Sequence, residues 1–143
     1  MSRAGAQVGI DLHLPSDAPS VRMARVVVVA ALDVVGVSLS CRDDIAVAVG
    51  EACGNVVAHA GDIVKYGLTM NILDGRCLVE VRDEGSGFVE HGPWTRPTAN
   101  ALSGRGLYLI SLLMDEVVVT SRPGLGTAVW FAKRLTFAES GGG

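Results

Sequence analysis

The chain has 143 residues, of which 49% are hydrophobic and 19% charged, and its formal net charge is −3 at pH 7. This length and composition predict one globular domain over residues 1–143, with flexible ends at residues 1–7 and 138–143. Lysines and arginines form no block, so the basic surface of a nucleic-acid-binding or membrane-surface protein is not indicated. The expected partners are therefore small molecules or other proteins.

Hydrophobic runs and cysteines indicate neither a membrane span nor a disulfide or zinc framework. The longest uninterrupted apolar run, Val26 to Leu32, is too short to cross a bilayer, and the first residues lack a signal-peptide pattern. A cytoplasmic location is the resulting expectation. Cys41, Cys53 and Cys77 are odd in number and lack CxxC spacing, so we expect them to act as small hydrophobic residues.

A strand and then a helix are predicted at the start of the chain. Residues Val8 to Leu14 alternate apolar and polar side chains, as in a strand with one buried face. Ser16 and Asp17 are candidate N-caps with Pro19 just inside the helix, and Gly36 is a natural end. The predicted core stripe of this helix is Val21, Ala24, Val28, Ala31, Leu32 and Val35.

Two apolar residues of this helix, Val26 and Val29, lie off the predicted core stripe. The helix is therefore expected to be apolar on more than one side. Either the additional side is buried within the domain, which is the simpler interpretation, or it contacts a second subunit or another protein.

The helix predicted from Asp44 to Ala60 carries few polar residues, and these are aligned. Glu51 and Asn55 are four residues apart and share one stripe. Behind them lie Gly50 and Gly54, each of which costs a helix about 1 kcal/mol relative to alanine. Close backbone approach is the only explanation that the sequence offers for Gly54. A carboxylate beside a carboxamide could hold a metal ion and accept a reacting proton.

The remaining elements predict an α+β two-layer sandwich, with a mixed, mostly antiparallel sheet and helices on one face. Asp74-Gly75 is a strong hairpin signal between two strand-like runs. Residues 89–103 lack periodicity and read as a long loop. The predicted strands are Ile63 to Leu73, Cys77 to Asp83, Glu116 to Ser121 and Thr127 to Leu135, and a third helix begins at Gly104 and ends near Asp115.

Taken singly, the candidate functional residues have ordinary structural interpretations. An Asp-x-Gly-x-Gly segment after a strand, as at Asp83, is usually a turn, and a Gly-x-Gly that opens a helix, as at Gly104, is usually a tight connection. Glu51 alone would be a solvated helix residue. His59, near the end of its helix, would complement the helix dipole.

Taken together, the order and spacing of these residues resemble the four sequence boxes of the GHKL ATP-binding family, from Asp44 to about Phe131. This resemblance implies the Bergerat fold, an α/β sandwich of the kind predicted above. The matches are Glu51-x-x-x-Asn55-x-x-x-His59-Ala60 for the N box, Asp83-Glu84-Gly85-Ser86-Gly87-Phe88 for the G1 box, Gly104-Arg105-Gly106-Leu107-Tyr108-Leu109-Ile110 with Asp115 for the G2 box, and Gly126-Thr127 for the last box.

The resemblance implies ATP and Mg²⁺ as cofactors, with a role for each matched residue. Asn55 would coordinate Mg²⁺, Glu51 would be the general base, and Asp83 would accept a hydrogen bond from the adenine amino group. Thr127 would add a hydroxyl near the base. Gly85 and Gly87 would let the backbone approach adenine, residues 89–103 would form a lid, Gly104, Gly106 and Leu107 would bring backbone N–H groups to phosphate, and Arg105 would contact phosphate or a partner.

Within the GHKL family, the arrangement of the whole chain most resembles the bacterial anti-sigma-factor serine/threonine kinases. The implied function is to bind ATP-Mg, sequester a sigma factor and phosphorylate an anti-anti-sigma antagonist protein. A homodimer is a further expectation from this resemblance. The alternative is a nucleotide-dependent regulator that binds its partner without phosphoryl transfer.

Overall fold

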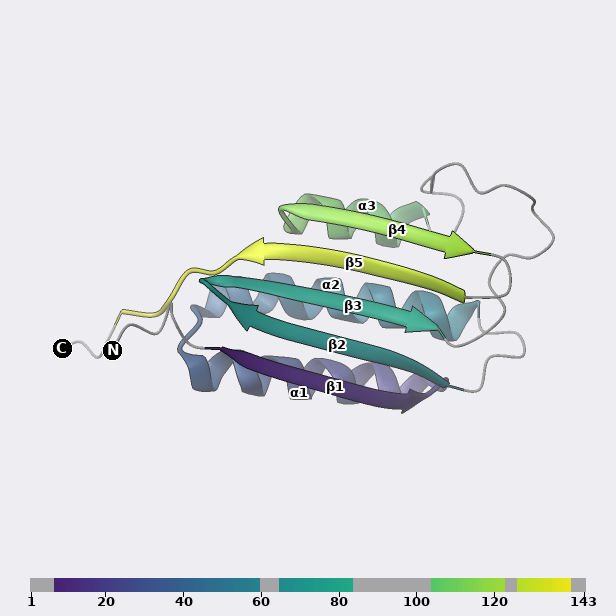
Figure 1. Ribbon diagram of the computed structural model, residues 1–143, viewed down its shortest axis with the longest axis horizontal. Helices are drawn as coiled ribbons and strands as arrows, with labels where there is room; N and C mark the ends of the chain where they lie inside the picture. Colours follow the sequence, from purple (N-terminus) through teal and green to yellow (C-terminus); the bar gives the residue numbers. More distant parts are fainter. Residues whose placement is uncertain (1–6, 60–64, 84–103, 123–125, 140–143) are drawn as a thin grey trace.

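The computed structural model describes residues 7–59, 65–83, 104–122 and 126–139. These residues form one sheet and three helices, and the helices lie together on one face of the sheet (Figure 1). The two-layer α+β architecture predicted from the sequence is confirmed. In chain order the elements are β1 (Val8–Pro15), α1 (Ala18–Val35), α2 (Leu39–Ala58), β2 (Lys65–Leu73), β3 (Arg76–Asp83), α3 (Gly104–Leu113), β4 (Glu116–Arg122) and β5 (Gly126–Arg134).

The five strands are ordered β1-β2-β3-β5-β4. All four strand pairings among the described residues are antiparallel, so the parallel component of the expected mixed sheet does not occur there. Strand β5 lies between β3 and β4, which brings the last strand of the chain beside the end of β3. This insertion places Asp83 and Thr127 next to each other, although they are far apart in sequence.

Helix α1 follows the sequence prediction at both ends. The Asp17 side chain accepts a hydrogen bond from the backbone N–H of Ser20, and Gly36 ends the helix with φ of 94°, a conformation that favours glycine. The second apolar side of α1 is only partly buried among the described residues. Val26 is 59% exposed, so the interpretation of burial within the domain is wrong for Val26, whereas Val29 is partly buried.

Helix α2 begins at Leu39, one turn and more before the predicted start at Asp44. The N-cap is Ser38, which was not predicted. Its hydroxyl accepts a hydrogen bond from the Cys41 N–H. The helix ends at Ala58, and Ala60 lies outside the described residues.

The two glycines of α2 differ in their surroundings. A Cβ at Gly50 would lie 3.1 Å from Cδ of Arg25 on α1, so Gly50 leaves room for the Arg25 side chain. No atom of the described residues lies within 4 Å of a Cβ built at Gly54, so close backbone approach does not explain that glycine.

The hairpin between β2 and β3 confirms the turn prediction. Asp74 and Gly75 have φ values of 53° and 73°, as expected for the central residues of a two-residue turn that matches the strand twist. The core fills the space between sheet and helices, and its largest fully buried side chains include Tyr66, Phe131, Leu32, Ile45 and Ile110.

The three cysteines are free and buried, in agreement with their expected role as small hydrophobic residues. Burial raises the pKa of both Cys53 and Cys77 to about 12, so both remain neutral thiols. Within the described part of the chain, no helix combines the length and apolar character needed to cross a bilayer.

Candidate functional site

A small pocket opens where α2, β3 and β5 meet. It lies at the end of the sheet where β3 ends, β5 begins and α2 ends, and the first turn of α3 lies at the same end (Figure 1). Four polar side chains and four apolar ones line it. They are Asn55, His59, Asp83 and Thr127, with Ala52, Val56, Val81 and Val129.

Asn55 is the polar residue with the clearest unmet requirement. It is 8% exposed, and its Nδ2 is buried without a hydrogen-bond partner among the described residues. Buried carboxamides in native proteins are nearly always hydrogen-bonded, so such a group is expected to be satisfied by a ligand. Since no hydrogen bond of Nδ2 to the described residues holds the amide in one orientation, the group can present either its oxygen or its nitrogen to the pocket.

The residues present fit an oxygen-preferring cation held mainly by a ligand. The described residues contain no cluster of three or more His, Cys, Asp or Glu side chains that could hold a metal ion. Mg²⁺ is commonly bound by one or two protein oxygens together with substrate phosphates and water, rather than by a cage of protein ligands. Asn55 Oδ1 is an oxygen of the required type, and it would hold the ion only when a phosphate group completes the site.

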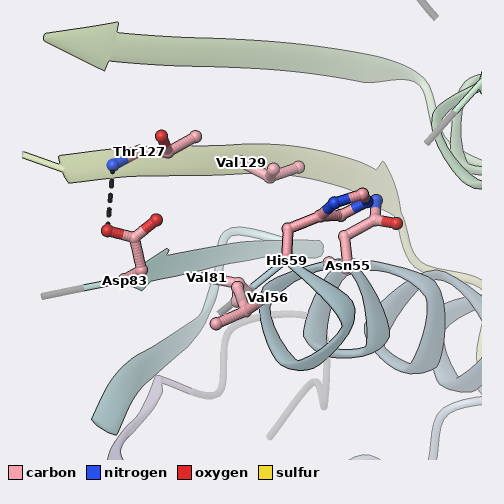
Figure 2. Close-up of a pocket in the computed structure, with 8 residues that line it drawn as sticks. Asn55, Val56, His59, Val81, Asp83, Thr127 and Val129 are labelled. Atoms are coloured by element: carbon pink, nitrogen blue, oxygen red, sulfur yellow. Dashed lines mark hydrogen bonds between the residues drawn. The ribbon is translucent and has the colours of Figure 1, made fainter. Parts of the chain in front are cut away.

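Asp83 and Thr127 face each other across neighbouring strands on the opposite side of the pocket (Figure 2). The backbone N–H of Thr127 donates to Oδ1 of Asp83 at 3.3 Å, which ties the carboxylate to β5. The Thr127 hydroxyl lies 3.1 Å from the hydroxyl of Ser121 on β4. A carboxylate in this position can accept a hydrogen bond from an amino group, and a hydroxyl beside it can support the same ligand.

Apolar side chains separate the two polar parts of the pocket. Val56 lies on α2, while Val81 and Val129 lie on β3 and β5. Branched aliphatic surfaces of this kind suit the faces of a flat heteroaromatic ring, with the polar groups contacting its edge. The pocket is therefore suited to a planar base at one side and a charged group at the other.

His59 was matched to the N box in the sequence, but no role in binding was assigned to it. It caps α2, where its backbone N–H donates to the carbonyl of Asn55, and its side chain also lines the pocket. Its position four residues after Asn55 was the available signal, because that spacing places both residues on one side of a helix. Ala52, Val56, Val81 and Val129 were not singled out, because apolar residues at these positions are indistinguishable from core residues in the sequence.

The other predicted site residues are only partly brought together. Glu51 is half-buried on α2, one turn before Asn55, and is not among the residues that line the pocket. Gly104 is the first residue of α3, Arg105 is exposed, and Gly106 and Leu107 are buried on a helix that packs against α2. Gly85, Gly87 and the predicted lid at residues 89–103 lie outside the described residues.

The sheet, its helical layer and a polar-rimmed pocket at their junction define a two-layer α+β domain with a candidate ligand-binding site. The family profile described as histidine kinase-like ATPase domain matches residues 14–133 of this chain. This match covers most of the chain and includes every described element except most of β1 and the last residue of β5, Arg134. The chain belongs to the histidine kinase-like ATPase domain family.

The chain is also similar to individual proteins whose function is known. The chain is 32% identical over 132 residues to the serine-protein kinase RsbW of Bacillus velezensis, covering 84% of this chain and 82% of that protein. It is 33% identical over 132 residues to the serine-protein kinase RsbW of Bacillus subtilis, with the same coverage. These relatives agree with the resemblance inferred from the four boxes.

A solved structure supports the fold. The crystal structure of the RsbU and RsbW domains of Rv1364c from Mycobacterium tuberculosis matches 90% of this chain with a TM-score of 0.69 and 20% sequence identity. The match spans 32% of that longer chain. The antiparallel sheet with helices on one face is therefore the fold of a known structure.

Proposed function

We propose that this protein binds ATP together with Mg²⁺ in the pocket between α2, β3 and β5. The observation that carries the proposal is the unpartnered, buried carboxamide of Asn55, which lies across an apolar floor from the Asp83–Thr127 pair. The base would occupy the side lined by Asp83 and Thr127. The phosphates would extend toward Asn55 and His59.

Each pocket residue has a separate task in this proposal. Asp83 accepts a hydrogen bond from the adenine amino group, and a guanine carbonyl at that place would meet the carboxylate unfavourably. Asn55 binds Mg²⁺ through Oδ1, while the ion supplies neutralisation of phosphate charge. His59 donates a ring N–H to phosphate oxygen. The proposed site is completed by Gly85 and Gly87, whose backbone would approach adenine, and by Gly104, Arg105 and Gly106, which would contact phosphate.

The proposed reaction is transfer of the γ-phosphoryl group to a serine or threonine of a protein. Glu51 lies one helical turn from Asn55 and would accept the hydroxyl proton as general base. The named relatives are serine-protein kinases, which supports this class of reaction. By the resemblance to anti-sigma-factor kinases, the substrate is an anti-anti-sigma antagonist and the sequestered partner is a sigma factor.

A nucleotide-dependent regulator without transfer is the second candidate. The observation that favours it is the absence of Glu51 from the residues that line the pocket, whereas Asn55 and Asp83 do line it. Binding of ATP would then control capture of a partner protein, and no phosphate would be transferred.

Two measurements test these proposals in sequence. Thermal unfolding with and without ATP and Mg²⁺ reports binding, since ligand at a hundredfold excess over Kd adds about 2.7 kcal/mol to stability. An unchanged melting temperature would contradict the proposed nucleotide site. Incubation with labelled ATP and a candidate antagonist, encoded by a neighbouring short reading frame, then reports transfer. Binding of ATP without labelling of the antagonist would contradict the kinase proposal and support the regulator.

A homodimer formed through α1 belongs to the same proposal. Met23, Val26 and Val34 form an exposed apolar stripe, and a groove lined by residues of α1 and α2 lies beside it. Arg25, Asp33 and Arg42 also line this groove, and Nη1 of Arg42 lies 3.4 Å from Oδ1 of Asp33, so the charge of Asp33 is balanced within the chain. Val26→Glu is expected to give a monomer in sedimentation analysis; an unchanged dimer would place the interface elsewhere.

The cytoplasmic location and the single-domain extent of residues 1–143 stay predictions.

A further inference from the structure

A buried chain of hydroxyl and thiol groups lies directly behind the candidate site. Tyr66 on β2 is fully buried, and its hydroxyl lies 2.6 Å from the Ser20 hydroxyl on α1. The Ser20 hydroxyl in turn donates to the carbonyl of Asp17 at 2.7 Å. The Tyr66 hydroxyl is also hydrogen-bonded to the thiol of Cys53 on α2. One tyrosine therefore connects α1, α2 and the sheet.

The direction of these hydrogen bonds follows from the number of protons. A serine hydroxyl has one proton, and that of Ser20 is donated to the Asp17 carbonyl, so Ser20 accepts from Tyr66. The Tyr66 oxygen is then left as an acceptor for the Cys53 thiol. Burial raises the pKa of Cys53 to about 12 and that of Tyr66 above its usual range, so all the protons of the chain stay in place at neutral pH.

Tyr66 lies next to the elements that carry both sides of the site. In the β2–β3 register Tyr66 lies directly opposite Asp83, and such cross-strand neighbours on one face have Cβ atoms about 5 Å apart. Cys53 lies midway between Glu51 and Asn55 in sequence, so it projects from the side of α2 opposite to both. Tyr66 thus supports the strand that carries Asp83 and holds the rear of the helix that carries Asn55.

We propose that Tyr66 is a positioning residue that sets the distance between Asn55 and Asp83, and thereby the fit of the pocket to its nucleotide. This inference rests on the proposed function. The two groups lie on separate elements, and a ligand that contacts both binds best when their separation is already set. Without the hydroxyl, Cys53 loses an acceptor, Ser20 loses a donor, and α2 is no longer tied to β2 at this point.

The test is Tyr66→Phe, which keeps the buried ring and removes the oxygen. The matched control is Ile72→Val, a mild core change on the same strand at its other end, where the side chain is 1% exposed. We expect Tyr66→Phe to raise the Kd of a non-hydrolysable ATP analogue with Mg²⁺ about fivefold to tenfold in calorimetry. Ile72→Val is expected to leave Kd within about twofold, even though it also lowers the melting temperature.

A double-mutant cycle separates positioning from general loss of stability. If the thiol and hydroxyl act together, Cys53→Ala in the Tyr66→Phe background changes Kd by much less than Cys53→Ala alone. The inference is overturned if the Tyr66→Phe variant binds the analogue as wild type does, or if Ile72→Val weakens binding equally. It is also overturned if the effects of Tyr66→Phe and Cys53→Ala on Kd are additive. Failure of the wild type itself to bind the analogue would instead overturn the proposed nucleotide site.

Discussion

The two ends of the sheet handle their polar groups differently. At the hairpin end, which comprises the Asp74–Gly75 turn, the Gly36–Ser38 connection and the C-terminus of α3, polar groups are paired within the protein (Figure 1). Lys133 donates to the carbonyl of Leu113 at 2.8 Å and lies 3.5 Å from a carboxylate oxygen of Asp44. The hairpin end thus has the arrangement expected of a region that stabilises the fold.

At the pocket end, where α2 and β3 terminate, two buried side-chain atoms, Asn55 Nδ2 and Ser16 Oγ, have no hydrogen-bond partner among the described residues, although Asp83 and Tyr66 are hydrogen-bonded there. Asn55, whose Nδ2 is one of these atoms, lines the pocket. His59 and Asp83 line the same pocket, and the space between them is open. Unsatisfied buried groups reduce stability and are retained where a ligand uses them. The difference indicates that the proposed ligand-binding role belongs to the pocket end, whereas the hairpin end contributes mainly to stability.

Glu51→Ala should produce the largest effect at the pocket end. Loss of a general base typically lowers the rate of transfer by about 10²–10⁴-fold, while the Kd for ATP should change little because Glu51 does not line the pocket. Single-turnover transfer to the antagonist and calorimetry with ATP measure the two quantities. Full transfer activity in the variant would assign the base to another residue.

Asn55→Ala should separate binding from stability. Because the carboxamide would hold the cation, the affinity for ATP-Mg should fall about tenfold or more. The unliganded protein should be as stable as wild type or more stable, because a buried group without a partner is removed. Denaturant unfolding without nucleotide checks this expectation. Strong destabilisation without nucleotide would show that the amide is structural and would break the comparison of the two ends.

Lys133→Met is the matching change at the hairpin end, since it keeps the aliphatic stem and removes the charge. The variant should lose about 1–2 kcal/mol of unfolding free energy, because the α3 carbonyl of Leu113 and the Asp44 carboxylate lose their shared partner. Its Kd for ATP should stay within about twofold of wild type. A large change in affinity would mean that the two ends are coupled.

Alkaline pH should act on the buried core rather than on the pocket. The thiol pKa values of Cys53 and Cys77 are raised from 9.0 to about 12 in the folded protein. The unfolded chain therefore releases these protons first as the pH rises. Their contribution to stability is complete below pH 9 and is lost between pH 9 and pH 12. Urea unfolding at a series of pH values should show this decline, and Cys77→Ala should reduce its slope.

Local signals in the sequence determined most of the fold. Asp17 and Gly36 predicted the ends of α1 because capping depends on a few neighbouring residues, and Asp74-Gly75 predicted the hairpin because both residues tolerate positive φ. The start of α2 was missed because Ser38 precedes several residues without a clear apolar period. The four boxes also predicted Asn55, Asp83 and Thr127 as one site, and the structure brings these three into one pocket.

Only the tertiary structure decided which residues act as neighbours across elements. The insertion of β5 between β3 and β4 joins Thr127 to Asp83, and no local pattern encodes this order of strands. The exposure of Val26 and the pocket position of His59 likewise depend on what packs against each helix. Periodicity in a sequence shows which side of a helix is apolar, but burial depends on the packing of other elements, which is a property of the folded chain.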